Sequence, residues 1–192
     1  MSKNEINTPK NNKKFSLKDI FFTTIFTIAF IIQIILMFIV KNEFNIPLLS
    51  YSGWVTWIIS LYLVFVPFFS FKKQGRVEKG KSYIHTSKVV KNGTYAIIRH
   101  PQYLGGILFT ISISLWNPVW FNLILSVMII VLTYQWTYTE DISLIEKFGE
   151  DYKHYKKKVP RLNPILGLIV YYIRKKSDNH FEQSNEKSTI LH

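Results

Sequence analysis

Three long blocks without a charged residue set the pattern of this chain. They cover residues 20–40, 44–71 and 101–139, and the charged residues gather between and after them. About 20 apolar residues cross the hydrocarbon core of a bilayer, so each of the first two blocks predicts one transmembrane helix. We therefore expect an all-α integral membrane protein.

The third block, of 39 residues, is too long for one crossing. As a single helix it would reach roughly 58 Å at about 1.5 Å per residue, nearly twice the thickness of the bilayer core. Trp116-Asn117-Pro118 offers a corner, because asparagine favours turns and proline starts a helix but cannot continue one. The block predicts a helical hairpin with arms 103–116 and 118–139, which brings the transmembrane helices to four.

A short amphipathic helix is expected on the cytoplasmic membrane face after the hairpin, over residues 140–157. Apolar side chains recur there at helical spacing between charged ones, at Ile145, Phe148, Tyr152 and Tyr155. Thr137 and Ser143 each precede a glutamate by three positions, which is the capping-box pattern of a helix start. Val159-Pro160 ends the helix, and the polar tail 177–192 is expected to be disordered.

Lysine and arginine lie mainly before the first block, between the second and third blocks, and after the third. Because cytoplasmic loops carry such an excess, four crossings with both termini in the cytoplasm satisfy every segment. The net charge of +12 is then mostly a signal of topology and of attraction to anionic lipid. No nucleic-acid partner is expected, because the lysines border the spans and form no folded basic module. The absence of cysteine and the spacing of the five histidines predict no metal site.

The most specific polar motif flanks the third block on both sides. Arg99-His100-Pro101-Gln102-Tyr103 opens the block, and Glu140-Asp141 closes it. Interfacial anchoring explains Arg99 and His100 taken alone, and the capping box explains the acidic pair. Anchoring does not explain the accompanying motifs, which are Asn92-Gly93-x-Tyr95, Phe148-Gly149-x-x-Tyr152-x-x-Tyr155 and Val159-Pro160.

On these motifs, residues 87–166 resemble the integral-membrane isoprenylcysteine carboxyl methyltransferases. The first two spans match that family only in being hydrophobic. The resemblance implies methyl transfer from S-adenosylmethionine to a lipidic or prenylated acceptor, either a small molecule or a protein C-terminus. Together with the pattern of blocks and charges, it predicts a layout of a cytoplasmic segment (1–19), two transmembrane helices (20–71), a methyltransferase core (72–176) and the tail (177–192).

The family's residues can be carried over by position. Its cofactor contacts would fall on Lys88, Val89, Val90, Tyr95, His100, Pro101, Gln102, Tyr103 and Glu140. Arg99 and Glu140 are the candidate catalytic residues: Arg99 or His100 can meet the cofactor's carboxylate, and Glu140 can accept from its ribose hydroxyls or ammonium. Tyr95 and Tyr103 can pack against the adenine or the sulfonium.

Two positions depart from the family. Ser87 occupies the place of a frequent histidine, with His85 two residues earlier, and Trp136 occupies the place of the arginine that holds the acceptor's carboxylate. Trp136 is therefore expected on the acceptor side of the site. A carboxylate acceptor needs no general base, whereas an amine needs one. The alternatives are N-methylation of an aminolipid by a phospholipid N-methyltransferase, and a membrane scaffold without catalysis.

Overall fold

The computed structural model describes residues 17–41, 46–74, 86 and 88–190. Within these ranges the chain is helical and has no strand, which confirms the all-α class. The helices are α1 (Leu17–Ile39), α2 (Pro47–Gln74), α3 (Pro101–Trp116), α4 (Trp120–Phe148), α5 (Glu150–Lys158) and α6 (Pro164–Ile190), with a short 3-10 helix η1 (Gly93–Ala96) before α3. The expectation for His85 and Ser87 falls outside the described residues.

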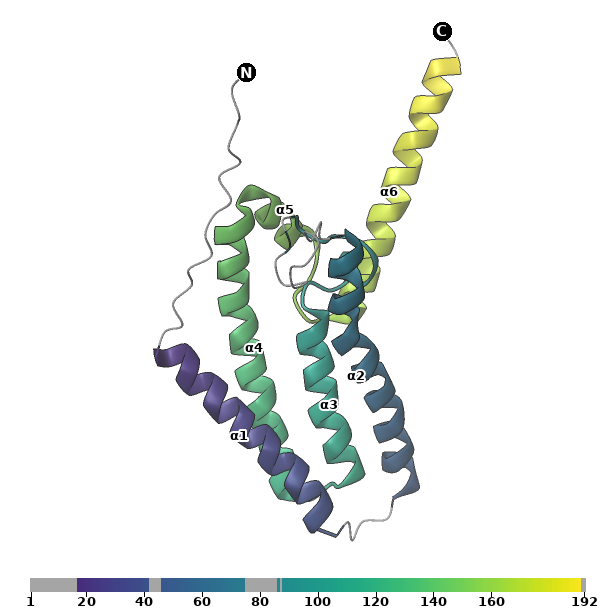
Figure 1. Ribbon diagram of the computed structural model, residues 1–192. Helices are drawn as coiled ribbons and strands as arrows, with labels where there is room; N and C mark the ends of the chain where they lie inside the picture. Colours follow the sequence, from purple (N-terminus) through teal and green to yellow (C-terminus); the bar gives the residue numbers. More distant parts are fainter. Residues whose placement is uncertain (1–16, 42–45, 75–85, 87, 191–192) are drawn as a thin grey trace.

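Four helices lie side by side, with α3 in their middle (Figure 1). α3 packs against α2 on one side and α4 on the other, while α1 crosses α4 and also touches α3. The end of α2, the start of α3 and the end of α4 gather at one end of this bundle, together with α5. The corner between α3 and α4 lies at the opposite end. The two polar segments that flank the third block, around His100 and around Asp141, therefore come together.

The predicted hairpin is confirmed. α3 ends at Trp116, α4 begins at Trp120, and the two helices pack against each other. Asn117 fixes the corner, because its Nδ2 donates to the carbonyl of Val40 at the end of α1 (2.7 Å) and its own carbonyl accepts from Asn122 Nδ2 (3.0 Å). At the other end of α3, Pro101 occupies the first helical position, where its missing N–H costs nothing.

A polar cluster ties α1 to the hairpin in the middle of the bundle. Gln33 Nε2 donates to Ser126 Oγ (2.7 Å), and Thr110 Oγ1 donates to Gln33 Oε1 (2.6 Å). Ser114 Oγ lies 2.6 Å from Ser126 Oγ. All four side chains are buried. Hydrogen bonds of this kind hold helices together where surrounding lipid offers no hydrophobic driving force.

The number of membrane crossings is settled only in part. Within the described residues, α2 and α4 are long and apolar enough to cross a membrane, and α1 contributes a shorter apolar stretch, Thr23–Ile39. α3 has 16 residues, which agrees with the expected short first arm. Four crossings and the cytoplasmic placement of the termini remain predictions.

The predicted start of the amphipathic helix expected over residues 140–157 was wrong. α4 continues without a break to Phe148, and the chain turns only at Gly149, whose φ of 58° suits glycine, before α5 begins. The hydroxyls of Thr137 and Ser143 donate back along α4, to the carbonyls of Tyr134 and Thr139, so neither residue caps a helix. No glycine or proline interrupts residues 120–148, which is why the helix does not stop at the acidic pair. The predicted end at Val159-Pro160 is confirmed.

The expectation of a disordered tail also differs from the structure. α6 begins at Pro164, where the side chain of Asn163 accepts from the backbone N–H of Leu166 (3.0 Å), and it continues to Ile190. It leaves the bundle at the end where α5 lies (Figure 1). Once the first turn has formed, each further residue adds a backbone hydrogen bond at low cost, so a polar sequence without proline can extend the helix.

Close packing of α2 against α3 leads to a stability test. A Cβ atom at Gly105 would lie 2.8 Å from Val64 Cγ2 and 3.0 Å from the backbone oxygen of Ser60, whereas one at Gly106 would meet nothing within 4 Å. Gly105→Ala should therefore lower the free energy of unfolding by about 1–3 kcal/mol. Gly106→Ala, the matched control, should raise it by up to about 1 kcal/mol, because alanine is the better helix former. Equal thermal unfolding temperatures for the two variants in detergent would refute this packing.

Candidate active site at the mouth of the hairpin

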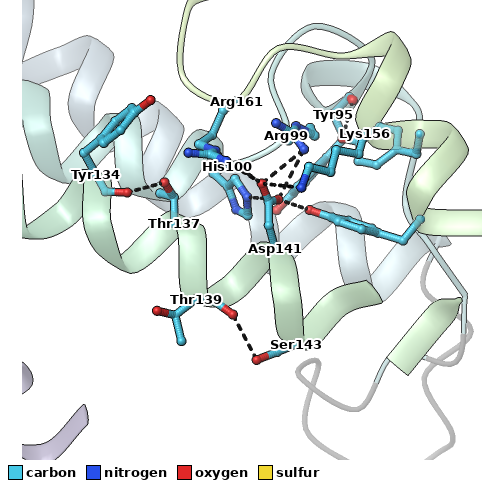
Figure 2. A network of polar contacts seen from close by, with 12 residues as sticks. Tyr95, Arg99, His100, Tyr134, Thr137, Thr139, Asp141, Ser143, Lys156 and Arg161 are labelled. Carbon is cyan, nitrogen blue, oxygen red and sulfur yellow. Dashed lines mark hydrogen bonds and ion pairs between the residues drawn. The ribbon is translucent and has the colours of Figure 1, made fainter. Parts of the chain in front are cut away.

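The site centres on Asp141, near the end of α4. Its side chain is fully buried and is surrounded by donors from three parts of the chain: the segment before α3, α5 and the segment after α5 (Figure 2). The Tyr152 hydroxyl donates to Oδ1 at 2.6 Å, and His100 Nε2 lies 2.9 Å from the same oxygen. Arg99 Nη1 lies 3.2 Å from Oδ2, and Arg161 reaches Oδ2 through Nε (3.2 Å) and Nη2 (3.1 Å). A buried carboxylate needs this many donors and cations because they offset the free energy that it loses when it leaves water.

Backbone pairing brings the donors to this point. The N–H of Arg99 donates to the carbonyl of Pro160 (3.1 Å), and the N–H of His100 donates to the carbonyl of Arg161 (3.3 Å). The segment before α3 therefore lies along the segment after α5. The turn at Gly149 directs α5 across the end of α4, which places Tyr152 over the carboxylate.

Apolar packing fixes α5 in place. Val89, Tyr152, Tyr155 and Val159 form a buried cluster, and Leu144, Ile145 and Phe148 pack against it. The apolar positions expected at helical spacing thus do pack together, although they belong to two helices. The hydroxyl of Tyr155 donates to the carbonyl of Tyr95 (2.7 Å), which joins α5 to η1.

The tyrosines around the site remain protonated. Burial raises the pKa of Tyr152, and its hydrogen bond to the negatively charged Asp141 raises it further. Burial is also the main cause that raises the pKa of Tyr95 and of Tyr155. At neutral pH each therefore offers a neutral hydroxyl group that can donate a hydrogen bond.

The structure divides the predicted site residues into two groups. Arg99 and His100 join at Asp141, whereas Tyr103 contacts the side chains of Gln102 and Trp136. Half-buried Glu140 interacts electrostatically with Tyr95 and Tyr103 and belongs to this second group. No hydrogen bond or ion pair links Glu140 to Arg99 or His100 in the described part of the chain. Its neighbour Asp141 forms these interactions instead.

The remaining predicted contacts are packed or exposed. Pro101 is buried at the start of α3, and Val90 packs with Val66 and Tyr95. Val89 packs instead against α5, and Lys88 is exposed. Val90 is thus the member of its segment that adjoins Tyr95.

The sequence reasoning missed Asp141 as the centre, and with it Tyr152 and Arg161. Successive residues of a helix point about 100° apart, so only one member of an acidic pair can face α3. The buried polar residues Thr137 and Thr133 lie four and eight positions before Asp141, respectively, on the same helical face. This spacing of polar residues was the available sequence signal that Asp141, rather than Glu140, faces inward.

Two buried polar atoms test whether a cofactor fits. The hydroxyl oxygen of Tyr95 and Nε of Arg99 are inaccessible to solvent and have no hydrogen-bond partner among the described residues. Buried groups of this kind normally have a partner. The guanidinium nitrogen of Arg99, the Tyr95 hydroxyl and the Glu140 carboxylate that interacts with Tyr95 suit a ligand that carries a carboxylate, hydroxyls and a cationic centre. The described residues contain no cluster of histidine, aspartate or glutamate that could hold a metal.

Comparison with known proteins assigns the family. A family model described as phospholipid methyltransferase matches residues 48–151, more than half of the chain. The chain belongs to the phospholipid methyltransferase family. The family match runs from the start of α2 through Asp141 and stops before Tyr152 and Arg161, so two of the donors to Asp141 lie outside it.

Curated relatives carry one name, protein-S-isoprenylcysteine O-methyltransferase, which confirms the resemblance seen in the motifs. The mouse protein is 31% identical over 123 residues, which cover 58% of this chain and 43% of the relative. The rat protein is 37% identical over 92 residues (47% and 31%), and that of Schizosaccharomyces pombe 31% over 105 residues (50% and 44%). The chain spans less than half the length of these relatives. No solved structure matches it.

The Tyr152–Asp141 hydrogen bond predicts a pH-dependent stability. Tyr152→Phe should lower the free energy of unfolding by about 1.5–3 kcal/mol, the range for a bond to a charged group. Since folding raises the pKa of Tyr152 above its unfolded value of about 10, this contribution is present below pH 10 and is lost as the pH rises further.

The difference in the free energy of unfolding between the wild type and Tyr152→Phe, measured between about pH 7 and 11, should therefore be constant up to pH 10 and decrease above it. Tyr172→Phe, at an exposed position of α6, is the control and should leave stability unchanged. If the gap for Tyr152→Phe stays the same across the whole range, the buried bond is not present.

Proposed function

We propose that this protein is a membrane-embedded methyltransferase that transfers a methyl group from S-adenosylmethionine to a lipidic or prenylated acceptor, at a carboxylate as in isoprenylcysteine O-methylation. The observation that carries the proposal is the convergence of Arg99 and His100 with the acidic end of α4 at the mouth of the hairpin. Membership of the methyltransferase family and the names of the relatives support it.

The residues that would hold the cofactor are those with unused polar capacity. Arg99 Nε can donate to its carboxylate, and the Tyr95 hydroxyl and Glu140 can meet its hydroxyls or ammonium. When bound, S-adenosylmethionine supplies an electrophilic methyl group on a positively charged sulfur. Asp141 would not contact the cofactor, since five neighbouring side chains already surround its oxygens; it positions Arg99 and His100.

Displacement at a methyl group needs alignment of the reactants and the exclusion of water. Arg99 and His100 are buried and held by both backbone and side-chain bonds, which gives the site fixed donors. Tyr103 and Trp136 add aromatic surface beside Glu140. A carboxylate acceptor would need no proton acceptor from the protein, and Asp141, surrounded by donors, has no free capacity to act as one.

N-methylation of an aminolipid is the second candidate. Trp136 occupies the position to which the family resemblance assigns the acceptor-binding arginine, and an indole ring attracts a methylated ammonium group rather than a carboxylate. The description of the matching family as phospholipid methyltransferase agrees with this reading. Glu140, half-buried beside Tyr103, would then accept the proton from the amine.

Cofactor binding tests the enzyme against a scaffold. The purified chain in detergent should bind S-adenosylmethionine with a dissociation constant in the micromolar to millimolar range, as measured by calorimetry. Glu140→Gln should weaken binding about tenfold or more, because it removes charge-assisted hydrogen bonds. Glu146→Gln, at an exposed position of the same helix, should bind as the wild type does. A wild type that binds no cofactor would leave the scaffold as the function.

The product identifies the acceptor class. Membranes containing the protein, supplied with cofactor labelled in the methyl group, should yield label in lipid-soluble products that mild base releases as methanol, since methyl esters are base-labile. Label that survives base in methylamines would instead establish the N-methyltransferase. Membranes with Arg99→Gln are the control and should incorporate little label in either form.

A further inference from the structure

One face of α4 is apolar, exposed and continuous. Ile124, Val127, Val131, Tyr134 and Tyr138 follow one another at spacings of three and four residues, and each is at least half exposed. This spacing places them in a single stripe along the helix. The neighbouring helices α1 and α3 contact other faces, where Ser126, Ile129 and Thr133 are buried.

The stripe has the length of a bilayer core. Exposed Trp120 stands at the start of α4, and exposed Tyr138 is the last residue of the stripe, ten positions before the helix ends at Phe148. Tyr138 follows Trp120 by 18 positions, a helical rise of about 27 Å, close to the roughly 30 Å of the hydrocarbon region. Tryptophan and tyrosine concentrate at the two membrane interfaces. A crossing by α4 would therefore place Tyr138 at the headgroup level of one leaflet.

Two cations stand at the Tyr138 end of the stripe. The guanidinium carbon of Arg161 lies 4.2 Å from the centre of the Tyr138 ring and 5.5 Å from that of Tyr134. Lys156 Nζ lies 3.9 Å from Asp141 Oδ2, and its side chain is 35% exposed. Asp141 also pairs with Arg99, so one carboxylate faces three basic side chains and positive charge remains in excess. A guanidinium has five N–H donors, and Asp141 accepts from only two nitrogens of Arg161.

We propose that the stripe and this basic pair form a binding site for an anionic membrane phospholipid, with an acyl chain along Ile124–Tyr138 and the phosphate on Arg161 and Lys156. Arginine binds phosphate with a matching planar geometry, and the excess positive charge favours a lipid of net negative charge. A second copy of the chain fits less well, because helix interfaces in membranes favour small residues and the stripe consists of branched and aromatic ones.

The site goes beyond methyl transfer and does not depend on it. The carbonyl of Arg161 accepts from the backbone N–H of His100, so a phosphate on Arg161 would help to hold the segment that carries the motif. Bound lipid should therefore raise the thermal stability of the protein, whatever reaction the site performs.

The test uses the full chain in detergent, titrated with phosphatidylglycerol or with phosphatidylcholine of the same acyl chains. Binding is counted by native mass spectrometry and followed by the unfolding temperature. Phosphatidylglycerol should bind more tightly and stabilise more. Lys156→Gln should weaken its binding about fivefold, as expected for one basic residue at a membrane surface. Lys157→Gln, an exposed neighbour on α5, makes the same change of charge away from Asp141 and should have no such effect.

Tyr138→Leu provides a second variant that leaves every partner of Asp141 in place. It should weaken phosphatidylglycerol binding without lowering the stability of the lipid-free protein. Equal affinity for the two lipids, or equal losses in Lys156→Gln and Lys157→Gln, would show that only the general positive charge of the chain attracts lipid and would overturn the proposal.

Discussion

A buried carboxylate with several cations around it determines how this molecule is held together at one end. Asp141 receives hydrogen bonds or ion pairs from the segment before α3, from α5 and from the segment after α5. Such a group cannot be left partly compensated, because a single unpaired charge in a buried position costs several kcal/mol. The three segments must therefore assemble together, and that assembly gives Arg99 and His100 fixed positions at the mouth of the hairpin.

The arrangement around Asp141 also gives the end of α4 two sides with different neighbours. Asp141 and the tyrosines of the stripe lie toward Arg161, whereas Trp136 and Glu140 lie toward Tyr103 and Tyr95. Positions 136 and 140 share one helical face, and positions 134 and 138 share another. The proposed cofactor and acceptor sites belong to the first face, and the proposed lipid site belongs to the second. Asp141 stands between them and connects both to one network of charges.

Much of the architecture follows from local chemistry. The uncharged blocks and the Asn117-Pro118 corner predicted the hairpin, because block length and turn chemistry act within a few residues. The start of the helix after the hairpin could not be predicted in this way. Thr137 and Ser143 match a capping pattern, but nothing near them breaks the helix, and continuous backbone hydrogen bonding prevails until Gly149.

The site was predictable only in its outline. The motif around His100 and the acidic pair pointed to the right end of the bundle. Which acid faces inward depends on the packing of α4 against α3, and the partners of Asp141 lie up to 42 positions away in the sequence. Arg161 in particular carries no local signal, because its role follows from the pairing of two loops that only the folded chain brings together.

Unfolding measurements on Asp141→Asn and Glu140→Gln test this account most directly. The two variants remove one charge each at adjacent positions, so they differ only in the surroundings of the carboxylate. Asp141→Asn should lower the free energy of unfolding by about 3–5 kcal/mol, because it leaves buried cations without their partner. Glu140→Gln should change it by less than about 1 kcal/mol. Equal effects, or a larger loss at position 140, would contradict the central role of Asp141.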